Sequence, residues 1–256
     1  MHMIKEIENN YGIKITKFIK NEESTIGNVY IIYTNSNKYV LKIYDDINLL
    51  NSMISIHDNI SKYLYVPSIV KTISNKSYIR YNNKYLLLYT FLEGIQIEYI
   101  DRTPNIIKEL GIALRNFHDY SKENIYNLSN VPSNKLNRKS LLHFDLTKSN
   151  IFYNNKIGFI DFDDAKYGDS IYDVAILICN LFFSKTRGID KEGIKLFLDS
   201  YYGNDNMLKE KEIDYINKCA IYWIDLVTGE GDFNSSTKES FDIKKKMLQE
   251  FDFKSI

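Results

Sequence analysis

The 256-residue sequence has no surplus of either charge, few cysteines and no long apolar segment. Its 33 lysines and arginines are balanced by 33 aspartates and glutamates. A nucleic acid is therefore not expected as a partner, because binding to a phosphate backbone requires a basic surplus or patch. No apolar run reaches the ~18 residues of a membrane span, and charges interrupt the start of the chain, where a secretion signal would be apolar. We expect a cytoplasmic protein without a membrane partner.

The two cysteines, Cys179 and Cys219, both lie in apolar segments with a helical pattern. This position favours buried, reduced thiols over a disulfide framework. Internal repeats and low-complexity linkers are also missing, and the length of the chain allows one large domain or two lobes. We expect a monomer or a weak dimer.

The N-terminal part of the sequence predicts a small β-rich lobe with one helix. Runs of β-branched and aromatic residues between polar turns are typical of strands, whereas apolar residues three or four apart are typical of a helix. The expected elements are strands at 29–33 and 39–44 around a turn at 34–37, a helix at about 46–63, and strands near 77–81 and 85–91.

The pattern changes from strands to helices near residues 90–94. A helical period occupies 105–118, and the sequence after Ile171 remains mostly helical. We therefore divide the chain into an N-terminal lobe of residues 1–91 and a C-terminal lobe of residues 92–256.

The most informative segment is HFDLTKSN, which runs from His143 to Asn150. Asn150 follows Asp145 by five residues, the spacing of the kinase catalytic loop. Phosphoryl transfer to a hydroxyl requires one carboxylate beside the acceptor oxygen, and a second carboxylate with an amide oxygen to hold metal ions. Asp161, eleven residues after Asn150 at the end of an apolar run, is placed for the second task. The alternative is a chance match, because these residue types are common in ordinary loops.

A predicted β-hairpin connects the two halves of this pattern. The short apolar runs 151–153 and 157–160 are separated by two asparagines, which favour a turn. The hairpin would bring Asn150 and Asp161 to the same end, where both could reach one metal ion. Magnesium prefers oxygen ligands of this kind.

Segment 143–175 resembles the aminoglycoside phosphotransferase and choline kinase superfamily. The similarity lies in HFDLTKSN, in IDF at 160–162 and in YGDSIYDVA at 167–175, close to the family pattern HGDxxxxN, IDF and GDPxYDLA. Phe144 and Ser170 replace the usual glycine and proline. The resemblance implies an α+β, two-lobed protein-kinase-like fold. A small antiparallel β-sheet lobe with one helix would bind nucleotide, and a larger, mainly helical lobe would hold the catalytic and acceptor sites.

The resemblance also implies an enzyme that transfers the γ-phosphate of ATP, with GTP as the alternative, to a hydroxyl of a small molecule. Asp145 would orient the hydroxyl and accept its proton, and Asn150 and Asp161 would bind Mg²⁺. His143 would brace the loop through a hydrogen bond. Asp173 would cap a helix and anchor the catalytic loop from behind.

Nucleotide contacts are expected from the N-terminal lobe. Lys42 matches the strand lysine of kinases that contacts the α- and β-phosphates, and Ser24 and Gly27 resemble the phosphate loop of small-molecule kinases. Kinases usually pair the strand lysine with a glutamate from the next helix, but that helix has none here. Asp58, sixteen residues after Lys42, is the first candidate to replace it, and His57 is the second.

The acceptor is expected to be aminoglycoside-type or another cationic molecule, as in antibiotic resistance. Choline, ethanolamine and homoserine remain alternatives. Carboxylates and aromatic faces would suit a cation, and the candidates are Tyr201, Tyr202, Tyr222, Trp223, Asp225, Glu230 and Asp232. A non-catalytic nucleotide-binding protein is the rival from another class. A protein kinase is disfavoured because Asp163 stands where the DFG motif has glycine.

Overall fold

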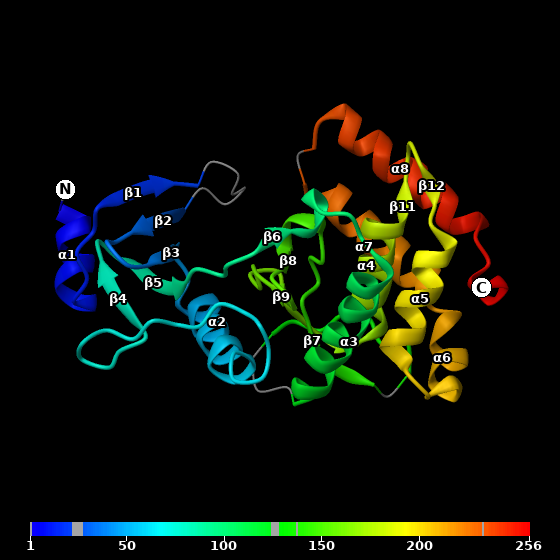
Figure 1. Cartoon of the computed structure of the whole chain (residues 1–256), viewed down its shortest axis with the longest axis horizontal. Coiled ribbons are helices and arrows are strands. Elements are labelled where there is room, and N and C mark those ends of the chain that lie inside the picture. The colour runs from blue at the N-terminus through cyan, green and yellow to red at the C-terminus, as the bar shows by residue number, and fades with distance from the viewer. Residues whose placement is uncertain (1, 22–27, 124–127, 137, 232) are drawn as a thin grey trace. The chain divides into compact units, whose positions relative to one another are not determined.

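The chain forms two compact units that divide between Glu93 and Gly94 (Figure 1). The computed structural model describes residues 2–21, 28–123, 128–136, 138–231 and 233–256. The division lies two residues beyond the boundary predicted from the sequence pattern.

Unit 1 is built on an antiparallel five-stranded sheet with the order β1-β2-β3-β5-β4. Its elements are α1 (His2–Tyr11), β1 (Lys17–Lys20), β2 (Val29–Tyr33), β3 (Lys38–Tyr44), α2 (Ile47–Ile60), β4 (Tyr78–Tyr81) and β5 (Lys84–Thr90). The four predicted strands are therefore confirmed. The predicted polar turn closes through the Thr34 amide, which donates to the Asn37 carbonyl at 2.9 Å.

The expectation of one helix in the small lobe was wrong, because the described part of unit 1 also contains α1. Ile7 and Tyr11 are four residues apart, so they share one face of this helix, and both are buried in the core of unit 1. The Tyr11 hydroxyl also donates to the Leu86 carbonyl of β5 at 3.4 Å. Two apolar contacts on a short, charged segment gave too weak a periodic signal to predict the helix.

Helix α2 begins where the sequence predicts. The Asp46 carboxylate accepts a hydrogen bond from the Asn48 amide and caps the first turn. The apolar face of the helix is buried, with Leu50, Met53, Ile56 and Ile60 fully covered. The helix ends at Ile60, three residues before the predicted end.

Unit 2 is mainly helical and carries small β-sheets. Its elements are β6 (Ile95–Gln96), the 3₁₀ helix η1 (Ile97–Tyr99), α3 (Pro104–Tyr120), β7 (Lys139–Leu142), η2 (Lys148–Asn150), β8 (Ile151–Tyr153), β9 (Ile157–Phe159), β10 (Lys166–Asp169), α4 (Ile171–Phe182), β11 (Phe183–Ser184), β12 (Gly188–Ile189), α5 (Lys191–Tyr202), α6 (Asn206–Ile213), α7 (Ile216–Glu230), α8 (Ser235–Glu250) and η3 (Phe253–Ser255). The prediction of helices at 105–118 and after Ile171 is confirmed.

Helices α3 and α5 pack closely at Gly111. A Cβ atom on Gly111 would lie 2.7 Å from the Phe197 carbonyl oxygen, so only glycine permits this approach. Thr103 caps α3 through the Ile106 amide, and Pro104 occupies the first turn, where it removes no hydrogen bond. This packing places α3 beneath the loop that follows β7.

Helix α4 lies in the centre of unit 2, and all of its residues are buried. Cys179 on α4 and Cys219 on α7 are both buried and free, as predicted. Burial raises the pKa of the Cys179 thiol to about 11 and that of Cys219 to about 12, so both thiols are protonated. Across the described ranges, no helix is long and apolar enough to cross a membrane.

Candidate active site

The loop between β7 and β8 brings Asp145 and Asn150 into direct contact. The Asn150 amide nitrogen donates to an Asp145 carboxylate oxygen at 2.8 Å and to the Asp145 carbonyl at 3.0 Å. Helix η2 forms the turn between them, and Asn150 is buried. The five-residue spacing therefore produces a fixed pair, with the Asp145 carboxylate half-buried at the surface of unit 2.

The predicted hairpin is confirmed. It places Asp161 directly after Ile160, the residue that is hydrogen-bonded to Asn150. Strands β8 and β9 pair antiparallel, with Ile151 opposite Phe159, and the Ile160 amide donates to the Asn150 carbonyl at 3.0 Å. Asp161 follows at the open end of the hairpin, with a left-handed backbone (φ +67°) and an exposed side chain. Both predicted metal ligands thus lie at one end of the hairpin.

His143 braces this loop, as expected. Its Nδ1 accepts a hydrogen bond from the Asp145 amide at 3.4 Å, so its Nε2 donates to the Ile160 carbonyl at 2.8 Å. The imidazole is fully buried against Phe162. His143 therefore links the catalytic loop to the residue before Asp161 and does not face solvent.

Asp173 anchors the loop from behind, but it does not cap a helix. Its two carboxylate oxygens accept the His143 amide at 2.7 Å and the Phe144 amide at 2.9 Å. It lies in the first turn of α4, whose N-cap residue is Ser170. The predicted anchoring is confirmed and the predicted capping is wrong.

A buried histidine completes this anchor. His118 on α3 donates from Nε2 to Asp173 at 3.2 Å, while its Nδ1 accepts from the Tyr201 hydroxyl at 2.7 Å. Burial lowers the pKa of His118, so the ring is neutral near pH 7 and binds Asp173 as a hydrogen-bond donor.

Phe144 adopts a backbone conformation that usually requires glycine. Its φ is +64°, in the left-handed region, where a side chain costs about 1–2 kcal/mol. Three contacts hold it there: the Phe144 amide donates to Asp173, the Trp223 indole donates to the Phe144 carbonyl at 3.0 Å, and the ring is buried. The replacement of the usual glycine is therefore compensated by long-range contacts. The sequence pattern did not predict the role of Trp223.

Negative charge accumulates beside Asp145. Burial raises the pKa of Asp145, and the nearby Asp164 and Asp161 carboxylates raise it further. The pKa of Asp164 is also raised, by loss of hydration and by Asp161 and Asp163. Mutual repulsion of this kind is relieved when a cation binds.

The donor set suits a cation that shares its shell with phosphate and water. Within the described ranges, no group of three or more histidine, cysteine, aspartate or glutamate side chains is arranged to hold a metal ion unaided. Mg²⁺ in kinases is typically held by one or two protein oxygens together with nucleotide phosphates and water. Asn150 and Asp161 provide one amide and one carboxylate for this purpose.

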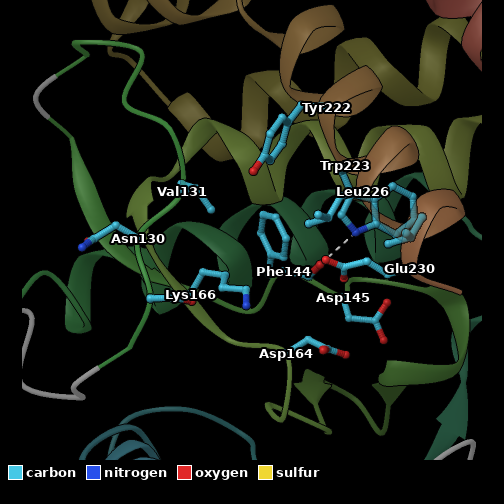
Figure 2. Close-up of a pocket in the computed structure, with 12 residues that line it drawn as sticks. Asn130, Val131, Phe144, Asp145, Asp164, Lys166, Tyr222, Trp223, Leu226 and Glu230 are labelled. Atoms are coloured by element: carbon cyan, nitrogen blue, oxygen red, sulfur yellow. Dashed lines mark hydrogen bonds between the residues drawn. The ribbon is translucent and has the colours of Figure 1, made fainter.

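A pocket of about 240 Å³ opens beside Asp145, entirely within unit 2. Figure 2 shows acidic and aromatic side chains from the catalytic loop, from Asp164 just before β10 and from α7, together with Lys166 of β10. The lining residues are Ser129, Asn130, Val131, Phe144, Asp145, Asp164, Lys166, Tyr222, Trp223, Leu226, Val227 and Glu230.

Three of the predicted acceptor contacts line this pocket: Tyr222, Trp223 and Glu230. Tyr201 and Tyr202 instead belong to the buried core. Asp225 forms an ion pair with Lys245, and Asp232 lies outside the described residues. Two charged lining residues, Asp164 and Lys166, were not predicted from the sequence as acceptor contacts. The available signal was the alternation of side chains at and just before β10.

The predicted nucleotide contacts lie in unit 1. Lys42 is on β3, opposite Val29 of β2 and Leu87 of β5, so a strand lysine is present as expected. Ser24 and Gly27 lie outside the described residues.

The carboxylate predicted to hold Lys42 has another partner. Both oxygens of Asp58 accept hydrogen bonds from Lys71, at 3.1 and 3.2 Å. His57 is buried, with its Nδ1 2.7 Å from the Pro67 carbonyl oxygen. Asp58 and His57 therefore both have hydrogen-bond partners other than Lys42 in unit 1, and the pairing of Asp58 with Lys42 stays a prediction.

Replacing Asp58 by Ala is expected to leave nucleotide KM within about twofold of wild type. The Asp58–Lys71 pair is largely exposed, and such pairs contribute about 0–1 kcal/mol. A double-mutant cycle with Lys42→Ala should show additive effects on nucleotide affinity. Coupling between the two positions above about 1 kcal/mol would restore the original role of Asp58.

The two-unit architecture has the protein-kinase-like fold that the sequence predicted. An amicoumacin kinase in complex with AMP-PNP, Ca²⁺ and Ami matches with a TM-score of 0.74 at 16% identity, over 99% of this chain and 96% of that one. A microcompartment-associated aminopropanol kinase matches with a TM-score of 0.69 at 11% identity, over 96% of this chain and 95% of that one. The ethanolamine kinase of Plasmodium vivax matches with a TM-score of 0.63 at 18% identity, over 93% of this chain and 83% of that one. Because these sequence identities are below 25%, the matches show a shared fold and not a shared substrate.

A family match supports the same assignment at the level of sequence. Residues 126–199, which contain the catalytic loop, the hairpin, all of α4 and most of α5, match the model of the phosphotransferase enzyme family. The predicted resemblance is therefore confirmed for this segment, and the matches are enzymes of the predicted class, phosphotransferases and small-molecule kinases. Among curated proteins, none matches the sequence significantly.

Proposed function

We propose that this protein is a kinase that transfers the γ-phosphate of ATP to a hydroxyl group of a small, amine-bearing molecule. The observation that carries this proposal is the contact between Asp145 and Asn150 beside a pocket lined by acidic and aromatic side chains. One carboxylate is fixed at the mouth of an acceptor-sized pocket, and the metal-ligand candidates adjoin it. This arrangement provides the parts that phosphoryl transfer needs.

Asp145 would act on the acceptor hydroxyl. Asp145 lines the pocket, and the Asn150 amide fixes one of its carboxylate oxygens, so the other can accept a hydrogen bond from the hydroxyl. This contact would orient the hydroxyl oxygen toward the phosphorus and receive its proton late in transfer.

Asn150 and Asp161 would hold Mg²⁺. With the Asn150 nitrogen donating to Asp145, the amide oxygen is the atom that suits a hard cation. Bound magnesium would neutralise the phosphate charge that develops during transfer. Lys42 would contact the α- and β-phosphates, as its place on β3 suggests. The use of AMP-PNP and Ca²⁺ in the amicoumacin kinase complex supports a nucleotide and a divalent metal here.

The acceptor class follows from the pocket lining. Glu230, Asp164 and Tyr222 would attract an ammonium group, through charge and through the face of the ring. The similar folds include kinases named for an antibiotic and for two amino alcohols, which supports aminoglycoside-type compounds and amino alcohols as acceptors.

The test is phosphate transfer from γ-labelled ATP, with Mg²⁺, to a panel of aminoglycosides, choline and amino alcohols. We expect one acceptor group to be phosphorylated and to raise the unfolding temperature with a non-hydrolysable nucleotide present. Nucleotide binding without transfer to any hydroxyl compound, and without hydrolysis, would favour the non-catalytic alternative.

Replacing Asp161 by Ala is expected to weaken Mg²⁺-dependent nucleotide binding at least about tenfold, and to lower kcat in parallel. The reason is the loss of a carboxylate ligand whose position is fixed by the β8–β9 hairpin. Calorimetric titration with Mg²⁺ and AMP-PNP measures the effect. Asp163→Ala is the matched control, and unchanged affinity in Asp161→Ala would move the metal site to that neighbour or to Asp164.

A further inference from the structure

Lys166 brings a positive charge into a pocket whose other charged residues are acidic. The pocket lining contains the carboxylates of Asp145, Asp164 and Glu230, and Lys166 is the one basic residue among the described lining residues. Figure 2 shows the Lys166 side chain extending into the pocket with its amine pointing inward, on the side opposite Glu230. An acceptor bearing only amines would be repelled at this end of the pocket.

The backbone fixes the position of Lys166. Strand β10 pairs with β7, with Lys166 opposite Leu142, just before the catalytic loop. On its other side, β10 is hydrogen-bonded to segment 129–131, where the Val131 amide donates to the Tyr167 carbonyl at 3.1 Å. The strand pairing on both sides fixes the point from which the Lys166 side chain leaves β10, so its charge stays at this end of the pocket.

Lys166 forms no ion pair with a carboxylate in the described part of the structure. No carboxylate of the described residues lies within 4.0 Å of its amine, whereas other lysines of unit 2, such as Lys209 and Lys245, form ion pairs. The residue is half-buried, which makes a charged partner more valuable than at the open surface. Burial raises the pKa of Asp164 and the charge of Lys166 counteracts this, so the two side chains influence each other without a direct bond. The Lys166 amine can therefore still donate hydrogen bonds to an anionic group of a ligand.

We propose that the acceptor is a small zwitterion, a hydroxyl compound that carries an acidic group bound by Lys166 as well as an amine bound by Glu230 and Asp164. This inference rests on the proposed function and narrows its acceptor class. The cavity of about 240 Å³ is consistent with a small molecule, since pockets for drug-sized ligands typically measure about 300–1,000 Å³. The buried Phe144 ring occupies part of the space beside Asp145.

The test compares pairs of acceptors that differ only in a carboxyl group: homoserine with 3-amino-1-propanol, and serine with ethanolamine. Kd is measured by calorimetry in the presence of Mg²⁺ and AMP-PNP, and transfer is measured separately with ATP. The wild-type protein should bind one acid-bearing compound at least about tenfold more tightly than its partner, as one charge-assisted hydrogen bond provides.

Lys166→Met should remove this preference, and Lys166→Glu should reverse it. Lys139→Met is the matched control, because Lys139 lies on the adjacent strand β7, is exposed and does not line the pocket. Equal binding of both members of each pair, or a preference that survives Lys166→Met, would overturn the inference while leaving kinase activity toward amino alcohols intact. A Lys166-dependent preference without any transfer of phosphate would support the zwitterion site and count against the proposed kinase activity.

Discussion

Asp145→Asn is expected to lower kcat at least about 100-fold while leaving the affinity for Mg²⁺ and nucleotide nearly unchanged. The substitution is isosteric, and the new amide oxygen can still accept the hydrogen bond from Asn150, so the loop should keep its shape. What is lost is the negative oxygen that orients the acceptor hydroxyl and accepts its proton, a contribution of roughly 10²–10⁴-fold in such enzymes. Steady-state kinetics with the best acceptor, together with nucleotide titration, measures both quantities.

Asp101→Asn serves as the control, because this aspartate is exposed in unit 2 and outside the pocket. It should retain wild-type kinetics. If Asp145→Asn keeps more than about a tenth of wild-type turnover, Asp145 is not the residue that acts on the hydroxyl. A simultaneous loss of nucleotide affinity would instead place Asp145 among the metal ligands.

Asp173→Asn is expected to destabilise the protein by about 3 kcal/mol and to lower kcat by more than tenfold. Asp173 is fully buried and accepts hydrogen bonds from two loop amides and from His118. An asparagine would turn an NH₂ group toward at least one of these donors, and a buried donor without an acceptor costs about 1–3 kcal/mol. The loop that holds Asp145 would lose its anchor at the same time.

Chemical denaturation and kinetics on the same preparation test this expectation. Asp199→Asn is a suitable control, since its pairing with Lys209 is half exposed, and we expect it to change stability by less than about 1 kcal/mol. Wild-type stability in Asp173→Asn would mean that the anchor is redundant. Reduced stability with normal kcat would show that the anchor supports the fold without positioning Asp145.

The parts of the molecule that could be predicted from the sequence are those fixed by neighbours along the chain. The spacing of Asp145 and Asn150 closes a contact within one turn, and the runs on either side of two asparagines favour the hairpin that the structure contains. Helix α3 was predictable because its buried residues recur with the helical period.

The parts that could not be predicted depend on contacts between distant segments. Trp223 reaches the Phe144 carbonyl across 79 positions, and no local pattern encodes that bond. The pocket position of Lys166 could not be predicted for the same reason, because the pocket forms where α7 and the catalytic loop meet beside β10. Asp58 illustrates the opposite case, because its spacing from Lys42 suits an ion pair, whereas the structure shows it bonded to Lys71, thirteen positions further along the chain.

The left-handed backbone of Phe144 makes the residue types at positions 144 and 223 depend on each other. A glycine at position 144 would adopt this backbone without steric cost, so it would not rely on the hydrogen bond from Trp223. A phenylalanine is strained, and the Trp223 indole is one of the groups that hold it in place. The residue type at position 144 is therefore coupled to the residue type at position 223. The catalytic loop in this way depends on a helix that is distant from it in the sequence.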